Sequence, residues 1–134
     1  MADGTFGTAI NCMDGRTQQP VSDWMKATFG VDYVDTITEP GADRALSSGT
    51  DEEIESVKRR VLISVQHHGS QHIAIVSHYD CAGNPAPDEI KLAMNKKAVE
   101  VVRSWSLPVR IVGLWLNDKW EVEVISDTES PDES

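Results

Sequence analysis

The chain contains two cysteines, and each follows an apolar segment. Cys12 ends one segment, while His78 and Cys81 follow another in a single short loop. Thiolates and imidazoles are ligands that Zn²⁺ prefers, and two ligands separated by two residues can bind one ion from a single turn. If the two segments lie side by side, these side chains occupy three corners of a tetrahedron, and the fourth is left for water or Asp14. The spacing therefore predicts a zinc site shared between two loops.

The same residues also allow interpretations without a metal. Two buried thiols and a hydrogen-bonded histidine would give the same pattern, and Asp14 and Arg16 could form an ordinary surface ion pair. Three other histidines lie close together near a predicted helix end, where histidine interacts favourably with the helix dipole; they are His67, His68 and His72. Because no cysteine or carboxylate cluster joins them, we predict a structural role for these three.

Apolar segments and helical stripes alternate along the chain and must position these residues. We expect strands at 6–12, 31–38, 72–77, 109–116 and 120–124. We expect helices between Pro20 and Gly30, between a capping box at Thr50 and Glu53 and Gly69, and between Pro87 and Leu107. The buried stripe of the last helix is predicted to be Ile90, Met94, Ala98, Val101, Val102 and Trp105. Residues 39–49 are expected to form a loop long enough to cover a site.

This order of elements predicts one α/β domain with a mainly parallel sheet. The predicted strand order is 2-1-3-4-5, with helices on both faces and the last strand antiparallel. The strands at 6–12 and 72–77 are then neighbours whose helices leave on opposite faces, and a crevice opens beyond their carboxyl ends. Cys12, His78 and Cys81 all fall at this crevice, and Asp80 is expected to be a solvated loop residue.

The motif Cys12-x-Asp14-x-Arg16, together with His78-x-x-Cys81, resembles the β-class carbonic anhydrases. The resemblance is specific at both motifs and extends more loosely over most of the chain. It implies that Cys12, His78 and Cys81 bind zinc, and that Asp14 and Arg16 form a catalytic carboxylate–guanidinium dyad beside it. An Arg16 paired with Asp14 would hold the carboxylate ionised and off the metal, ready to accept a hydrogen bond from the zinc-bound water. If that pair breaks, Asp14 becomes the possible fourth ligand.

The activity implied by the resemblance is the reversible hydration of CO2 to bicarbonate by zinc-bound hydroxide, which is the reaction of a carbonate dehydratase-like lyase. Zinc with an open position lowers the pKa of bound water from 15.7 towards about 7. Related folds hydrolyse other small heterocumulenes such as carbonyl sulfide or carbon disulfide. A catalytically silent zinc-binding module is the third alternative, and the sequence does not separate the three.

The chain departs from the family pattern in places that bear on the substrate pocket. Only about five residues precede the first predicted strand, where family members usually carry a helical arm that wraps the partner subunit. Ser77 and Ala82 stand where glycines are common, and residues 39–43 do not match the family's turn after the second strand. Because the family completes its pocket across a dimer, the resemblance implies a homodimer or a higher homo-oligomer.

Composition excludes several other classes of function. The chain has 134 residues, and its 22 acidic and 12 basic residues give a formal net charge of −10, which disfavours binding to nucleic acid or to anionic membranes. No signal peptide and no apolar run of about 20 residues is recognisable, so we expect a cytoplasmic protein. We predict a zinc-binding domain over residues 1–125 and an acidic, disordered tail over residues 126–134.

Overall fold

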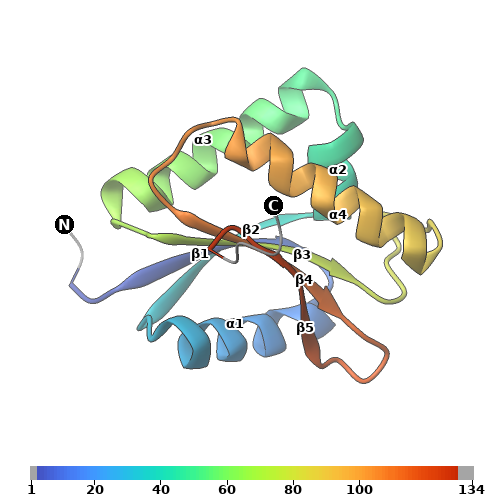
Figure 1. The fold of residues 1–134 in the computed structure, drawn as a ribbon, viewed down its shortest axis with the longest axis horizontal. Helices are drawn as coiled ribbons and strands as arrows, with labels where there is room; N and C mark the ends of the chain where they lie inside the picture. Colours follow the sequence, from blue (N-terminus) through green and yellow to red (C-terminus); the bar gives the residue numbers. More distant parts are fainter. Residues whose placement is uncertain (1–2, 130–134) are drawn as a thin grey trace.

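Strands and helices alternate along residues 3–129, which are the residues that the computed structural model describes. The strands are β1 (Phe6–Cys12), β2 (Tyr33–Glu39), β3 (His72–His78), β4 (Arg110–Leu116) and β5 (Val122–Asp127). The helices are α1 (Gly15–Phe29), α2 (Ala42–Ser48), α3 (Asp51–His67) and α4 (Asp88–Arg103). Figure 1 shows the strands in one twisted sheet between two layers of helix.

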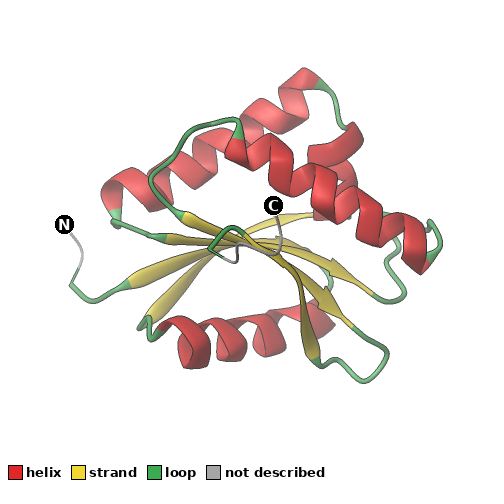
Figure 2. Ribbon diagram, viewed as in Figure 1, coloured by secondary structure: helices red, strands yellow, loops and turns green. Residues whose placement is uncertain are grey.

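The strand order of the sheet is β2-β1-β3-β4-β5, as the sequence predicted. The first four strands run parallel, and β5 is antiparallel to β4. In the centre of the sheet, Ile10 of β1 lies opposite Ile37 of β2 and Ile75 of β3. Helix α1 covers one face alone, and α2, α3 and α4 cover the other (Figure 2). The predicted fold class is therefore confirmed, and β1 and β3 end side by side.

The core lies on both faces of the sheet because the central strands are apolar throughout. In β3, Ile73 and Ile75 pack in the cluster beneath α3 and α4, while Ala74 and Val76 pack in the cluster above α1. Successive residues of a strand point to opposite faces, so a strand buried on both sides has no polar alternation. Fully burying an isoleucine or valine side chain stabilises the fold by about 1.5–3 kcal/mol.

Helix α1 begins earlier than predicted. The prediction placed Pro20 in the first turn, but the helix starts at Gly15 and Pro20 lies inside it. Asp14 is the N-cap residue, and its carboxylate accepts a hydrogen bond from the backbone N–H of Arg16 at 2.9 Å. The helix ends as predicted at Gly30, whose φ of 69° is left-handed. The first helix therefore starts within the Cys12-x-Asp14-x-Arg16 motif.

Residues 39–49 contain a helix, α2, so the prediction of an open loop there is wrong. The capping box that opens α3 is confirmed, because the Thr50 side chain accepts from the Glu53 N–H and the Glu53 carboxylate accepts from the Thr50 N–H. The short helix buries Ala42, Asp43 and Leu46 against the sheet. Helix α2 is therefore part of the packed core next to the strand ends and is not a loop over the candidate site.

Helix α4 buries Ala98 and Val102 of the predicted stripe, but in its first half the buried positions are Lys91 and Asn95 in place of Ile90 and Met94. Its buried residues are Lys91, Asn95, Ala98, Val99 and Val102, and the predicted Ile90 is 52% exposed. The last strand is displaced, since Trp120 lies in the turn before β5. Ser126 and Asp127 belong to β5 and not to the predicted tail. Residues 130–134 lie outside the described residues, and within residues 3–129 no helix is long and apolar enough to span a membrane.

Candidate metal centre

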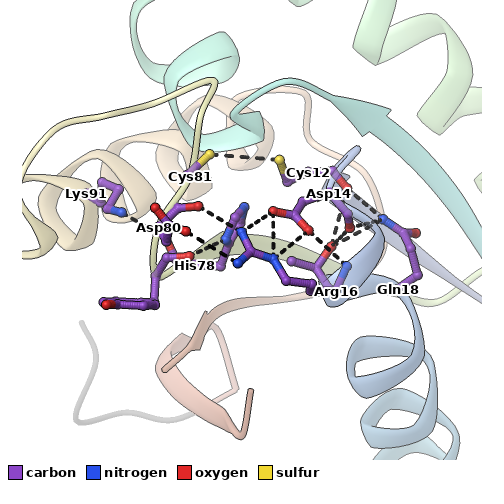
Figure 3. A network of polar contacts seen from close by, with 10 residues as sticks. Cys12, Asp14, Arg16, Gln18, His78, Asp80, Cys81 and Lys91 are labelled. Atoms are coloured by element: carbon purple, nitrogen blue, oxygen red, sulfur yellow. Dashed lines mark hydrogen bonds and ion pairs between the residues drawn. The ribbon is translucent and has the colours of Figure 1, made fainter. Parts of the chain in front are cut away.

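The three predicted ligands converge where β1 and β3 end. Cys12 is the last residue of β1, His78 is the last residue of β3, and Cys81 lies in the loop that follows. The two Sγ atoms are 3.8 Å apart, and the ligand atoms of all three residues lie within 4.8 Å of one another. All three side chains are buried, and Figure 3 shows the two thiols facing each other. Two sequence motifs 69 positions apart therefore meet at one point.

The His78 ring is oriented as a metal ligand would be. Its Nδ1 lies 2.7 Å from the carbonyl oxygen of Tyr79, which can only accept, so Nδ1 carries the proton. Its Nε2 is then an acceptor, yet this atom is buried and has no hydrogen-bond partner among residues 3–129. A buried polar atom without a partner is costly. A cation at the point where the ligand atoms meet would remove that cost, so the donor set fits a metal ion.

The two thiols share a negative charge in this arrangement. The hydrogen bond between them lowers the pKa of Cys12 and raises the pKa of Cys81, because the thiolate on one sulfur holds the proton on the other. Burial disfavours the His78 imidazolium, but Cys12 and the Tyr79 carbonyl outweigh this effect and raise the pKa of His78. The cluster attracts positive charge, as a divalent cation site must.

Asp14 is turned towards Arg16. Its Oδ2 lies 2.7 Å from Arg16 Nη2, and its Oδ1 lies 3.1 Å from Arg16 Nε. This bidentate hydrogen bonding lowers the pKa of Asp14 to about 2 and raises that of Arg16. Among the described residues, the converging ligand group consists of the two cysteines and His78, and Asp14 is not part of it. The carboxylate is therefore ionised and held by the guanidinium group.

Arg16 also binds the loop that carries the other two ligands. Its Nη2 donates to the carbonyl oxygen of Asp80 at 3.1 Å, and its Nη1 lies 3.3 Å from the Asp80 carboxylate (Figure 3). Asp80 is an exposed loop residue, as predicted, and it also contacts Arg16. One arginine thus connects the Cys12 loop with the His78–Cys81 loop.

A buried polar cluster behind the ligands was not predicted from the sequence. The carboxylate of Asp43 in α2 accepts hydrogen bonds from Ser77 Oγ at 2.7 Å and Asn84 Nδ2 at 2.9 Å. The Asn84 N–H in turn donates to the carbonyl oxygen of Cys81 at 3.2 Å. Ser77, which stands where glycine is common in the family, thus provides a hydroxyl for Asp43. No spacing in the sequence links these residues, because they come from three separate segments.

Lys91 is a second contributor that the sequence analysis missed. Its buried Nζ donates to the carbonyl oxygen of His78 at 2.9 Å, and it lies 5.4 Å from the centroid of the Trp115 ring. Lysine is almost never buried without a partner. The sequence did contain a signal for the burial of Lys91. Lys91 and Asn95 are four residues apart and lie on the same face of α4 as the buried Ala98 and Val102.

The backbones of the loops after β2 and β3 are in direct contact beside the thiols, at Pro40, Gly41 and Gly83. A Cβ atom added at Gly83 would lie 2.3 Å from the carbonyl carbon of Pro40, and one added at Gly41 would lie 2.9 Å from the carbonyl carbon of Gly83. Both distances are shorter than the 3.0 Å at which a Cβ atom can approach another heavy atom, so neither glycine can be replaced without moving the backbone. Gly41 also has a φ of +76°, which glycine adopts without strain.

The three histidines near the end of α3 lie at the other end of the sheet. His68 Nδ1 lies 2.6 Å from Asp35 Oδ2, and its ring stacks on Phe6. His72 stacks on Phe29. They do not belong to the metal-ligating group that the described residues form.

Four clefts in the described residues lie away from the thiols. The larger two of these four, of about 540 and 410 Å³, lie at the start of β4 and between α4 and β5, respectively. None of the four is lined by Cys12, His78 or Cys81. The candidate ligands themselves are buried, with Cys12, His78 and Cys81 no more than 5% exposed.

Comparison with known proteins places the chain in a family. A family model with the description "Putative carbonic anhydrase" matches residues 2–126. The β-carbonic anhydrase isoform I of the protozoan Trichomonas vaginalis has a TM-score of 0.64 at 19% identity, covering 93% of this chain and 85% of that chain. A search of curated proteins finds no match.

Two further structures have the same fold. One of two tetrameric β-carbonic anhydrases from Sordaria macrospora has a TM-score of 0.59 at 13% identity, covering 90% of this chain and 81% of that chain. A carbonic anhydrase from Glaciozyma antarctica has a TM-score of 0.58 at 18% identity, covering 89% and 80%. The family match spans nearly the whole described chain, and the fold agrees with it, so the chain belongs to the β-carbonic anhydrase family.

Proposed function

We propose that the protein is a zinc-dependent carbonic anhydrase that interconverts CO2 and bicarbonate. Cys12, His78 and Cys81 would hold the metal, and Asp14 and Arg16 would form the catalytic dyad. One observation carries the proposal. Two buried thiols lie close to the Nε2 atom of His78, and that atom has no hydrogen-bond partner among residues 3–129. The family match supports the reaction.

The donor set selects the class of metal. Two soft thiolates and one imidazole favour zinc over magnesium or calcium, which prefer oxygen ligands. Three protein ligands leave one position for a reactant, which is the arrangement of catalytic rather than structural zinc sites. In such a site zinc supplies a nucleophile near neutral pH, because it lowers the pKa of a bound water towards about 7.

The residues around the ligands have separate roles in this proposal. Asp14, held ionised by Arg16, accepts a hydrogen bond from the reacting water and orients it. The Tyr79 carbonyl keeps the proton on Nδ1 of His78, so that Nε2 stays available as a ligand. Arg16 prevents the Asp14 carboxylate from turning towards the thiols and closing the site.

Assembly of several copies would complete the substrate pocket. Met13 and Tyr79, each next to a proposed ligand, are 64% and 43% exposed. Exposed apolar side chains beside a candidate site are typical of surfaces that a partner covers. We therefore propose a homodimer or a higher homo-oligomer with no nucleic-acid or membrane partner, in line with the Sordaria macrospora proteins, which are tetrameric. The cytoplasmic location and the acidic tail stay predictions.

Metal analysis combined with stopped-flow CO2 hydration tests the proposed function. We expect stoichiometric zinc in the purified protein, and an Asp14→Ala variant should keep the metal while kcat/KM falls by about 10²–10⁴-fold. Asp23→Ala is a matched control, because Asp23 is an exposed carboxylate of the same helix whose side-chain hydrogen-bond partner within residues 3–129 is Gln19. Carbonyl sulfide hydrolysis without CO2 hydration would indicate the related hydrolase. Stoichiometric zinc with neither activity would indicate a silent module.

A further inference from the structure

A tryptophan from the far end of the chain lies against Arg16. The guanidinium carbon of Arg16 is 4.5 Å from the centroid of the Trp120 ring. The same ring lies 6.0 Å from the centroid of the His78 imidazole. Trp120 comes from the turn between β4 and β5, which neither of the two sequence motifs includes. A third segment of the chain therefore contacts the dyad.

Both residues that hold Arg16 from outside its own loop have strained backbones. Trp120 has a φ of 61° and Asp80 a φ of 56°, in the left-handed region, which is uncommon for residues other than glycine and least favourable for a bulky side chain such as that of Trp120. Over residues 3–129, Ser106 is the other non-glycine residue with a positive φ. Two of these three strained residues thus contact the same guanidinium group, and strain of this kind persists where the surrounding structure enforces it.

The turn that carries Trp120 is fixed by Asn117. The Trp120 N–H donates to the Asn117 carbonyl oxygen at 2.9 Å, and the Asn117 side-chain oxygen accepts from the N–H groups of Lys119 and Glu121. The Trp120 ring also packs against the core cluster that lies between the sheet and α1. The indole is therefore held from its backbone and from one of its faces.

The edge of the Arg16 guanidinium group is held by hydrogen bonds to Asp14 and Asp80, and the Trp120 ring is the contact on its face. The Arg16 side chain is 48% exposed, and a long flexible side chain loses rotamer entropy when it takes one position. A guanidinium group stacked on an aromatic face keeps its edge free for hydrogen bonds. The indole therefore fixes the plane of the guanidinium group, and its edge then meets the two oxygens of Asp14.

We propose that Trp120 is a positioning residue for the Asp14–Arg16 dyad. Its ring holds Arg16 where the guanidinium keeps the Asp14 carboxylate turned away from Cys12, His78 and Cys81. Without the indole, Arg16 leaves this position and Asp14 becomes free to take the open place on the metal. The consequence at the metal rests on the proposed function, whereas the stacking contact does not.

Azide binding to the cobalt-substituted protein tests whether the open position is free. Visible absorption should show azide binding to the wild type and to Trp120→Phe, which retains an aromatic face. In Trp120→Ala the azide affinity should fall by about 10–100-fold, the size of effect seen when the partner of a metal ligand is lost. The double variant Trp120→Ala with Asp14→Ala should recover it, because no carboxylate is left to compete.

Arg110 provides the matched control, because it lies 5.4 Å from the ring of Phe29 and pairs with Asp127 away from the thiols. Phe29→Leu removes that ring and should leave azide affinity unchanged. Unchanged affinity in Trp120→Ala, or no recovery in the double variant, would overturn the proposal. Circular dichroism establishes that each variant is folded.

The stacking contact is measured separately in the metal-free protein. We expect the ¹⁵N-edited NMR signal of the Arg16 Nε–H group to shift and broaden in Trp120→Ala and to persist in Phe29→Leu. An unchanged Arg16 signal overturns the positioning role whether or not metal binds. A wild-type protein that takes up neither zinc nor cobalt overturns the proposed function instead, so the two failures are distinguishable.

Discussion

Two arginines, one at each end of the parallel strands, make the same set of contacts in different surroundings. Arg16 binds Asp14 through two hydrogen bonds and lies over Trp120, and Arg110 binds Asp127 through two hydrogen bonds and lies over Phe29. In both pairs the hydrogen bonds lower the pKa of the aspartate and raise that of the arginine. The chemistry of the two assemblies is the same.

The difference lies in what each pair faces. Arg110 opens β4, and its partner Asp127 closes β5, so that pair joins two adjacent strands. Arg16 lies beside two thiols and an unpaired ring nitrogen, and it joins two ligand loops. A perturbed carboxylate therefore identifies a functional site only when other reactive groups converge on it.

The two ends also differ in how they make left-handed turns. At the end away from the thiols, Gly4, Gly30 and Gly69 take positive φ angles, with Ser106 as an exception. At the ligand end, Gly41 also takes a positive φ angle, but Asp80 and Trp120 take them with full side chains. Glycine makes such turns without strain. Strain is thus accepted where the side chain at the turn contacts Arg16.

The strongest test of this comparison replaces, in separate variants, each of the two histidines at the ends of β3 by alanine. His72 and His78 each have a buried ring nitrogen without a partner among residues 3–129, but only His78 has thiols next to it. We expect His78→Ala to lose stoichiometric zinc and to hydrate CO2 no faster than buffer. His72→Ala should retain both the metal and the activity. Equal metal content in the two variants would contradict the assignment of the site.

A second test compares the arginines directly. Arg16→Ala should lower kcat/KM for CO2 hydration by about 10²–10⁴-fold, because Asp14 is released from its orientation. Arg110→Ala should leave kcat/KM unchanged and lower the free energy of unfolding by about 0.5–1 kcal/mol. Stopped-flow kinetics and urea unfolding measure the two effects. A loss of activity in both variants would show that the contrast between the ends is wrong.

The polar cluster behind the ligands gives a third, smaller effect. Asp43→Ala leaves the buried donors of Ser77 and Asn84 unpaired, so it should cost about 1–3 kcal/mol of stability. Zinc affinity should also fall by about 10–100-fold, because the loop carrying Cys81 loses its support. Asp35→Asn changes a comparable cluster at the other end and should alter stability alone. Competition with a chromophoric chelator measures the affinity, and equal zinc affinities would refute the role given to Asp43.

The smallest effect concerns the pH dependence of the Arg110 pair. The folded pKa of Asp127 lies below its unfolded value of about 3.9, because Arg110 stabilises the ionised form. The pair therefore contributes stability above that value, and the contribution disappears as the pH falls through the folded pKa. Urea unfolding of the wild type and Asp127→Asn should differ by less than about 1 kcal/mol at pH 7 and converge in acid. A gap that widens in acid would contradict this sign.

The sheet and the convergence of Cys12, His78 and Cys81 were predictable because both depend on local patterns. The short apolar runs that contain Ile10 and Ile75 are typical of buried parallel strands, and right-handed crossovers leave few orders for them. Once those strands are neighbours, Cys12 and His78 must lie near each other. The glycine at position 30 likewise indicated the end of α1.

The rest of the site depends on contacts that no local pattern encodes. Trp120 was assigned to a strand because Trp120–Val124 alternates, yet its left-handed φ places it in a turn against Arg16. Asp43 was assigned to a loop because helix α2 is too short to show a periodic stripe. Pro20 suggested a helix start, but the capping carboxylate of Asp14 sets the start five residues before that proline, at Gly15.

The main-chain contact between the loops at Gly83 and Pro40 limits how this protein can change over evolutionary time. A single methyl group at position 83 would overlap the neighbouring peptide unit, so a saturation library there should return glycine alone among the active clones. Substitutions at Ile63, which is 55% exposed on α3, should be tolerated far more widely. Natural variation in this protein would then collect on its outer surface, while position 83 stays glycine for reasons of space rather than chemistry.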